Sequence, residues 1–214
     1  MSLTVLGRDS FFSPHRRTCA LVPVKARALC KTRLAPVLCC AARVELVRWM
    51  LDAVLAAAAK SKSIQRVIVI SPERDCVPPH IPLLADSGES LNSALSMARS
   101  TLQGPDCMDV AILPADLPRI TAREIDALVH AGRAGGFSIA PDAAGTGTNA
   151  LYVAGCVSFN FQFGRASREA HLEEARRRGL GAQLVHSPGL AFDVDGAAEL
   201  EALEEWSWNT HLRA

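Results

Sequence analysis

Residues 21–34 read LVPVKARALCKTRL, in which an apolar segment runs into a basic loop. The apolar residues at 20–24 are typical of a strand that is buried in a sheet. The cations that follow this strand are Lys25, Arg27, Lys31 and Arg33. Residues 37–55 then carry apolar side chains at helical spacing, which predicts a helix. A strand, a loop and a helix in this order place the loop at the carboxyl edge of a parallel sheet, where nucleotides bind.

The basic loop lacks the glycines of the common phosphate-binding motifs. If it binds phosphates, ammonium and guanidinium side chains must therefore supply much of the contact. The alternative is a charged loop that lies outside the core and only faces solvent. The loop by itself does not decide between these two interpretations.

The chain has 214 residues, a length that suits one α/β domain, and its hydrophobic fraction of 49% is sufficient for a core. A formal net charge of +1 gives no overall field that would favour nucleic acid or an anionic membrane. The seven cysteines show no zinc-site spacing, and we find no signal peptide and no membrane-spanning run. We therefore expect a reduced, soluble, cytoplasmic protein.

Apolar segments alternate with amphipathic ones along the rest of the chain. Strands are expected at 66–72, 81–85, 109–113, 137–140, 150–153, 182–187 and 191–195. Helices are expected at 91–102 with Ser90 as N-cap, after a capping box of Thr121 and Glu124, at 168–178 and at 197–206. The pattern predicts one α/β domain over residues 18–214, preceded by an extension over residues 1–17.

Aspartates stand where a metal could be bound. Asp116 follows the apolar strand 109–113 between two prolines that stiffen the turn. Asp193 and Asp195 are two positions apart in an expected strand, and so face the same side. Together with a basic loop, such carboxylates suit magnesium-assisted phosphoryl or nucleotidyl transfer. The alternatives are that Asp116 only supports its turn and that Asp195 only caps the last helix.

Loops of small residues follow later in the chain. Residues 145–149, GTGTN, can turn backbone amides and hydroxyls toward an anion. Residues 163–167, FGRAS, precede a helix whose expected cap is Ser167. Most loops of this kind are only turns. His171 lies one turn beyond Ser167 and could face the same pocket, but a solvated helix histidine is the interpretation we favour.

These segments together resemble the 2-phospholactate or phosphoenolpyruvate guanylyltransferases, which make the activated phospho-acid of the deazaflavin coenzyme F-420. The matching segments are PVKARALCKTRLAP, SLNSAL, ILPADLP, APDAAGTGTNAL, FGRAS followed by HL, and SPGLAFDVDGAAEL. They cover most of residues 20–203 in the family's order. The resemblance implies a Rossmann-like mixed sheet of the nucleotide-diphospho-sugar transferase type. This sequence departs from the family at Ser90, at Gly196-Ala197, and at Arg165-Ala166, where the family has Pro-Gly.

The resemblance implies a Mg²⁺-dependent enzyme that joins GMP from GTP to a small phospho-acid in coenzyme F-420 biosynthesis, with release of pyrophosphate. The acid would be 2-phospho-L-lactate, phosphoenolpyruvate or 3-phospho-D-glycerate. The residues implied for the GTP phosphates are Lys25, Lys31 and Arg33, and those for the nucleoside are Pro23, Lys25, Gly88, Asn92 and Pro114. The metal would be held by Asp116 with one or both of Asp193 and Asp195. The acid would be received by Thr148, Gly164 and Ser167, and at the departure from the family by Arg165.

Other functions stay open from the sequence. A nucleotidyltransferase of this fold that acts on a sugar phosphate or a molybdopterin would favour a glycine-rich first loop, which the chain lacks. A non-catalytic nucleotide-binding protein could lose the carboxylates, which the chain keeps. We expect GTP and the acid as ligands, and neither nucleic acid nor membrane. A homodimer and contact with the next enzyme of the pathway remain open.

Overall fold

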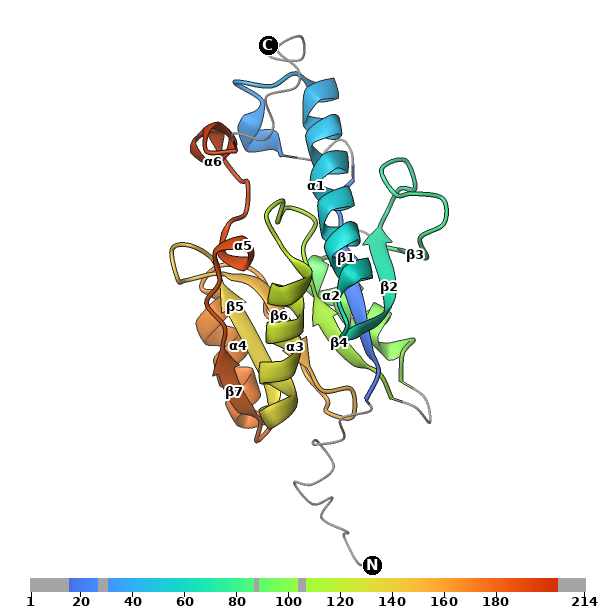
Figure 1. The fold of residues 1–214 in the computed structure, drawn as a ribbon, viewed down its shortest axis with the longest axis vertical. Coiled ribbons are helices and arrows are strands. Elements are labelled where there is room, and N and C mark those ends of the chain that lie inside the picture. The colour runs from blue at the N-terminus through green and yellow to red at the C-terminus, as the bar shows by residue number, and fades with distance from the viewer. Residues whose placement is uncertain (1–15, 27–30, 87–88, 104–106, 204–214) are drawn as a thin grey trace, which may run out of the picture.

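The computed structural model describes residues 16–26, 31–86, 89–103 and 107–203. Its centre is a seven-stranded sheet of order β3-β2-β1-β4-β6-β5-β7 (Figure 1). The strands are β1 (Thr18–Pro23), β2 (Ile64–Ser71), β3 (Leu83–Ala85), β4 (Asp109–Ile112), β5 (Gly136–Pro141), β6 (Thr148–Val153) and β7 (Gly181–Leu184). Strand β6 is antiparallel to β4 and β5, and the other neighbouring pairs are parallel. The predicted Rossmann-like mixed α/β sheet is confirmed.

The helices are α1 (Cys40–Lys60), α2 (Leu91–Ser100), α3 (Ala122–Gly135), α4 (Ser167–Arg177), α5 (Pro188–Ala191) and α6 (Ala197–Glu201), with a 3-10 turn η3 (Thr32–Leu34). Two predicted caps are confirmed. Ser90 accepts a hydrogen bond from the Ser93 amide at 3.1 Å, and Thr121 and Glu124 form a capping box at α3. Within the described ranges, no helix is both long enough and apolar enough to cross a membrane.

Strand β1 lies between β2 and β4, and helices cover both of its faces (Figure 1). Ala20 and Val22 pack into the core that α1 and α3 share, whereas Cys19 and Leu21 pack into the core on the α2 and α4 side. All four residues are fully buried. Burial on both faces explains why this strand is continuously apolar instead of alternating.

The segment at 191–195 is not a strand, contrary to the prediction. Pro188 is suited to open a helix, so the short helix α5 runs to Ala191. The residues after α5 are held by a hydrogen bond of 3.2 Å from the Val194 amide to the Asp116 carbonyl. This bond ties the segment to the loop after β4 and not to the edge of the sheet.

Two predicted helix starts are also wrong. The helix after Pro36 begins only at Cys40, because η3 and a further turn to Leu38 come first. Ser167 is not the cap of α4 but its first residue, and Ala166 is the N-cap. Asp195 does not cap α6 either. There the Glu199 carboxylate accepts a hydrogen bond of 2.8 Å from the amide of Gly196, the N-cap.

Ala166 adopts a left-handed backbone with φ 52° and ψ 34°. This conformation costs an L-residue about 1–2 kcal/mol, and glycine adopts it freely at a smaller entropic cost. We therefore expect Ala166→Gly to raise the free energy of unfolding by about 1 kcal/mol in urea denaturation. Ala170→Gly, inside α4, is the matched control and should lower it by about 1 kcal/mol. Equal destabilisation by both substitutions would contradict the expectation.

Candidate active site

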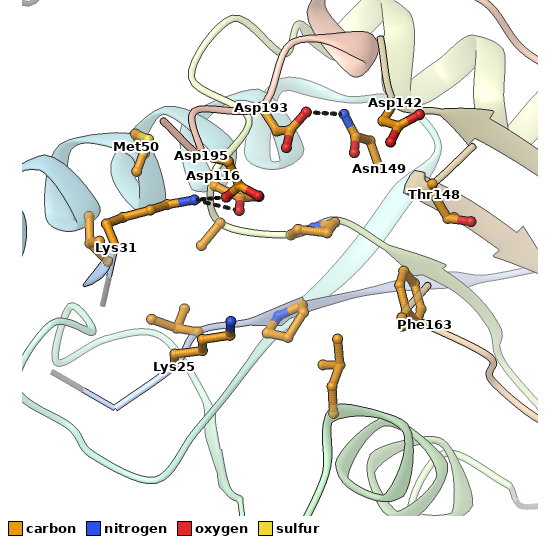
Figure 2. Close-up of a pocket in the computed structure, with 18 of the residues that line it drawn as sticks. Lys25, Lys31, Met50, Asp116, Asp142, Thr148, Asn149, Phe163, Asp193 and Asp195 are labelled. Carbon is orange, nitrogen blue, oxygen red and sulfur yellow. Dashed lines mark hydrogen bonds and ion pairs between the residues drawn. The ribbon is translucent and has the colours of Figure 1, made fainter. Parts of the chain in front are cut away.

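A cavity of about 670 Å³ opens at the carboxyl ends of β1, β2 and β4 (Figure 2). Loops 142–149 and 163–167 and the segment after α5 complete its wall. The predicted site residues that line it are Pro23, Lys25, Lys31, Arg33, Pro114, Asp116, Thr148, Gly164, Ser167, Asp193 and Asp195. Residues from distant parts of the chain thus converge where the parallel strands end.

The Lys31 ammonium is the centre of the charged end of this cavity. Its Nζ lies 2.8 Å from Asp116 Oδ2 and 2.8 Å from Asp195 Oδ1 (Figure 2). The Lys31 side chain is only 11% exposed, which contradicts the alternative of a solvated basic loop at this position. Burial by itself would lower the pKa of Lys31, but the two carboxylates raise that pKa above its ordinary value. The ammonium therefore stays charged at neutral pH.

The other cations lie at the rim of the same end. The Arg33 side chain is 78% exposed, and its guanidinium is 3.5 Å from Asp195 Oδ2. An exposed pair at that distance contributes little to stability. Lys25 follows β1 and lies across the cavity from Lys31 (Figure 2). It is close enough to Asp195 to favour the charged carboxylate there.

The paired aspartates have different surroundings. Burial would raise the pKa of Asp195, but the Lys31 ammonium lowers it. Burial raises the pKa of Asp193, and repulsion from Asp116 and Asp195 raises it further. The Asn149 amide donates to Asp193 Oδ1 at 3.0 Å and opposes that shift (Figure 2). Of the three aspartates, Asp193 is therefore the one with no cation among its described hydrogen-bond partners.

The aspartates do not form a ready-made metal cage. Among the described residues, no group of three histidine, cysteine, aspartate or glutamate side chains is close enough to hold a metal ion. Asp116 and Asp195 do converge on one point, and the Lys31 ammonium occupies it. Two carboxylate oxygens that share one cation are a donor set of the kind that Mg²⁺ takes from proteins.

The opposite end of the cavity is built mostly by small and neutral residues, although the Asp142 carboxylate lies near Thr148 (Figure 2). Thr148 and Ser167 are the first residues of β6 and α4, and Gly164 belongs to the loop before α4. Phe163 lines the same end beside Thr148 (Figure 2). The predicted acid-binding residues are therefore together, apart from Arg165, whose side chain is exposed and which does not line the cavity.

Asn92 is predicted to contact the nucleoside, but its side chain bonds to a loop of the protein instead. It does not line the cavity, because both ends of its amide pair with the backbone of Phe163. Its Nδ2 donates to the Phe163 carbonyl at 3.0 Å, and its Oδ1 accepts from the Phe163 amide at 2.8 Å. Asn92 thus fixes the loop that carries Gly164. Gly88, also predicted at the nucleoside, lies outside the described residues.

The sequence interpretation was wrong about His171, which is fully buried and not solvated. Its ring bonds to the pocket residue Thr148 at 3.0 Å and to the Gln162 amide at 2.8 Å. The interpretation also missed Asp142, which lines the cavity directly after β5. A signal for Asp142 was present, because it is a further carboxylate at a strand end. No apolar pattern marks His171, since its helix buries polar residues.

The chain is similar to known guanylyltransferases over most of its length. The family described as "Guanylyl transferase CofC like" matches residues 18–206. The phosphoenolpyruvate guanylyltransferase of Sphaerobacter thermophilus is 38% identical over 191 residues, which cover 87% of this chain and 92% of that protein. The 2-phospho-L-lactate guanylyltransferase of Methanothermobacter thermautotrophicus is 36% identical over 203 residues, with coverages of 92% and 88%.

Solved structures support the fold alone. A protein of Desulfovibrio desulfuricans G20 assigned as a nucleotide-diphospho-sugar transferase has a TM-score of 0.70 at 17% identity, with coverages of 91% of this chain and 89% of that chain. A 4-diphosphocytidyl-2C-methyl-D-erythritol synthase of Anaerococcus prevotii has a TM-score of 0.60 at 10% identity, with coverages of 87% and 94%. Since the family match spans nearly all of the described structure, the resemblance seen in the sequence is confirmed, and the chain belongs to the CofC-like guanylyl transferases.

Proposed function

We propose that this chain is a Mg²⁺-dependent guanylyltransferase that joins GMP from GTP to a small phospho-acid and releases pyrophosphate. The acid is phosphoenolpyruvate, 2-phospho-L-lactate or 3-phospho-D-glycerate, and the product serves coenzyme F-420 biosynthesis. One observation carries the proposal. The cavity at the carboxyl edge of the parallel strands joins cations, carboxylates and an end that carries the Thr148 and Ser167 hydroxyls in a single space.

The donor set fits Mg²⁺, which takes one or two carboxylates and completes its coordination with phosphate oxygens and water. Asp116 and Asp195 would hold it, because their oxygens already share one cation. Asp193 lies beside them, and burial, together with repulsion from Asp116 and Asp195, raises its pKa. A divalent ion would offset that repulsion. When bound, the ion would supply charge neutralisation at the phosphates of GTP.

The side chains of the cavity suit the substrates that we propose. A phosphate oxygen of the acid attacks the α-phosphorus of GTP, and the bond to the leaving pyrophosphate breaks. The attacking group needs no general base, because a phosphate monoester is already ionised near pH 7. Lys25 and Lys31 offset the negative charge of the triphosphate, and Thr148 and Ser167 position the acid. Catalysis is then positioning together with electrostatic stabilisation.

The direct test is pyrophosphate release by the purified chain, with each of the four nucleoside triphosphates against each of the three acids and with or without Mg²⁺. We expect release with GTP only, and only when Mg²⁺ and one of the acids are present. Release that does not depend on any of the acids would contradict the proposal. A chain that binds GTP but releases no pyrophosphate under every condition would instead support a non-catalytic nucleotide-binding protein.

Asp116→Asn should lower kcat by about two to three orders of magnitude. An amide keeps the size of the side chain but is a poor ligand for Mg²⁺. Asp52→Asn, at an exposed position of α1, is the matched control and should leave the rate unchanged. Circular dichroism should give similar melting curves for both variants. Wild-type turnover of Asp116→Asn at saturating Mg²⁺ and GTP would exclude Asp116 as a metal ligand.

Lys31→Ala and Arg33→Ala should impair the use of GTP to different degrees. We expect kcat/KM for GTP to fall at least about tenfold for the buried Lys31, and only a few-fold for the exposed Arg33. Lys60→Ala, at the end of α1, is the control and should have no effect. Rates at sub-saturating GTP measure the difference. If neither loop variant changes this rate, the loop does not bind the triphosphate.

Arg165 and Ala166 replace the Pro-Gly of the family, and we expect this change to affect which acid the chain uses. Arg165 is exposed and is not a wall residue, so its effect on the acid must act through the backbone of the loop. We propose that the altered loop favours 3-phospho-D-glycerate, whose carboxylate and phosphate are one atom further apart than those of 2-phospho-L-lactate. Equimolar competition among the three acids, with products separated by mass, should therefore give a glycerate adduct.

The same competition among the three acids is then run with the double variant Arg165→Pro, Ala166→Gly. This variant restores the family's residues in the loop, and we expect it to shift the product ratio away from the glycerate adduct. The glycerate preference is wrong if the wild type makes no such adduct or if the double variant gives the same ratio.

A further inference from the structure

His171 lies directly behind the neutral end of the cavity. The residue comes from the first turns of α4, and none of its surface is exposed. Its ring stacks on Phe159 at 6.1 Å and meets the edge of Phe163 at 4.8 Å between ring centroids. Thr148 bonds to the His171 ring and Phe163 packs against it, and both of these residues line the cavity, where Figure 2 draws them. His171 therefore does not face the cavity itself, but it contacts residues that do.

The hydrogen bonds of the ring determine its tautomer. The Gln162 backbone N–H can only donate, and it lies 2.8 Å from His171 Nε2. Nε2 must therefore be the unprotonated acceptor. Burial lowers the pKa of His171 to about 4, although a hydrogen bond to the Ser167 backbone opposes this shift. The ring is thus neutral at pH 7, and its single proton is on Nδ1.

The proton on Nδ1 fixes the role of Thr148. Nδ1 is 3.0 Å from Thr148 Oγ1. A protonated nitrogen cannot accept the hydroxyl hydrogen, even though the Ser167 backbone also bonds to the ring. The hydroxyl oxygen is therefore the acceptor, and its own hydrogen must point elsewhere. In the described part of the chain, no other group accepts that hydrogen. Thr148 is 9% exposed, and its exposed part belongs to the wall of the cavity.

We propose that His171 is a positioning residue that makes the Thr148 hydroxyl a hydrogen-bond donor for the anionic phospho-acid. The relay runs from the Gln162 N–H to His171 Nε2, from His171 Nδ1–H to Thr148 Oγ1, and from the Thr148 O–H to a carboxylate or phosphate oxygen. The inference rests on the proposed function, because it takes the anion to be that acid. With the opposite tautomer, the hydroxyl would donate to the ring and would present only lone pairs to the anion.

The binding of phosphoenolpyruvate, measured by calorimetry without GTP, tests this relay apart from turnover. The variants are His171→Leu, Thr148→Val and the two combined. A hydrogen bond to a charged group is worth about tenfold or more in affinity, so His171→Leu should weaken binding by about that factor. In the Thr148→Val background the same substitution should cost less than about twofold, since the hydroxyl that it orients is gone.

A second pair of variants separates the relay from mere packing, even if His171→Leu does not fold. In His171→Asn the amide nitrogen lies near the position of Nδ1 and keeps a donor for Thr148. In His171→Gln the amide group lies near the position of Nε2 and keeps only the contact to Gln162. We expect the asparagine variant to bind phosphoenolpyruvate at least about threefold more tightly than the glutamine variant. In turnover, His171→Gln should raise KM for the acid and leave KM for GTP within about twofold.

Additive effects in the Thr148 and His171 cycle would overturn the relay, as would equal increases of both KM values or equal binding by the asparagine and glutamine variants. The proposed function fails separately. If the wild type binds phosphoenolpyruvate but releases no pyrophosphate, the guanylyltransferase proposal is wrong, and the binding cycle still decides the role of His171. If the wild type binds none of the three acids, with or without GTP and Mg²⁺, both are overturned.

Discussion

The ion pairs of Lys31 with Asp116 and Asp195 join three segments that are distant in the chain. Lys31 precedes η3, Asp116 follows β4, and Asp195 follows α5. The charged end of the cavity depends on this arrangement, because the Lys31 side chain is only 11% exposed and a buried charge without a partner is strongly disfavoured. Lys31 reaches the position with a left-handed backbone, φ 46° and ψ 47°, which an L-residue adopts only at a cost. Strain of this kind is often found at functional sites, where the surrounding structure maintains it.

Strand β1 is buried in the middle of the sheet, and its fixed position helps to bring the partners of these ion pairs together. Helices cover both faces of the strand, so its end is fixed in all directions and delivers Pro23 and Lys25 to the cavity. The Leu113 amide bonds to the Leu21 carbonyl at 3.0 Å, which extends the pairing of β1 and β4 to the start of the Asp116 turn. The basic loop and the carboxylate therefore follow adjacent parallel strands at the same edge.

The sequence predicted what depends on local pattern. Continuous apolar runs identified the buried strands, and prolines around Asp116 identified its turn at a strand end. Asp193 and Asp195 line the cavity, but the strand that the sequence predicted for them is absent. A long-range bond from Val194 to Asp116 and the pair with Lys31 fix that segment, and periodicity in one segment cannot reveal either. The sequence also could not predict that Arg165 is exposed and Lys31 is buried. Both outcomes depend on how separate loops pack against each other.

The burial of His171 is a second feature that the sequence pattern could not predict. The buried positions of α4 are Ser167, His171, Glu174 and Ala175, whose spacing is helical but whose side chains are mostly polar. An apolar stripe cannot indicate such a face, because its burial depends on hydrogen bonds from outside the helix. Glu174 accepts from the Asn160 amide at 3.1 Å, as His171 does from the Gln162 amide at 2.8 Å. Residues 160–162 are thereby held against α4 by polar contacts.

The two ends of the cavity differ in the groups that would meet an anion under the proposed function. At the Lys31 end the groups are charged, and one ammonium pairs with two carboxylates. At the Thr148 end the donors are neutral, and the protein fixes their direction from behind through a buried ring. Donors that are oriented during folding need no reordering when an anion binds, which favours binding. In the proposed reaction a neutral histidine suits this end, since a second buried cation would compete with Lys31 for the same phosphates.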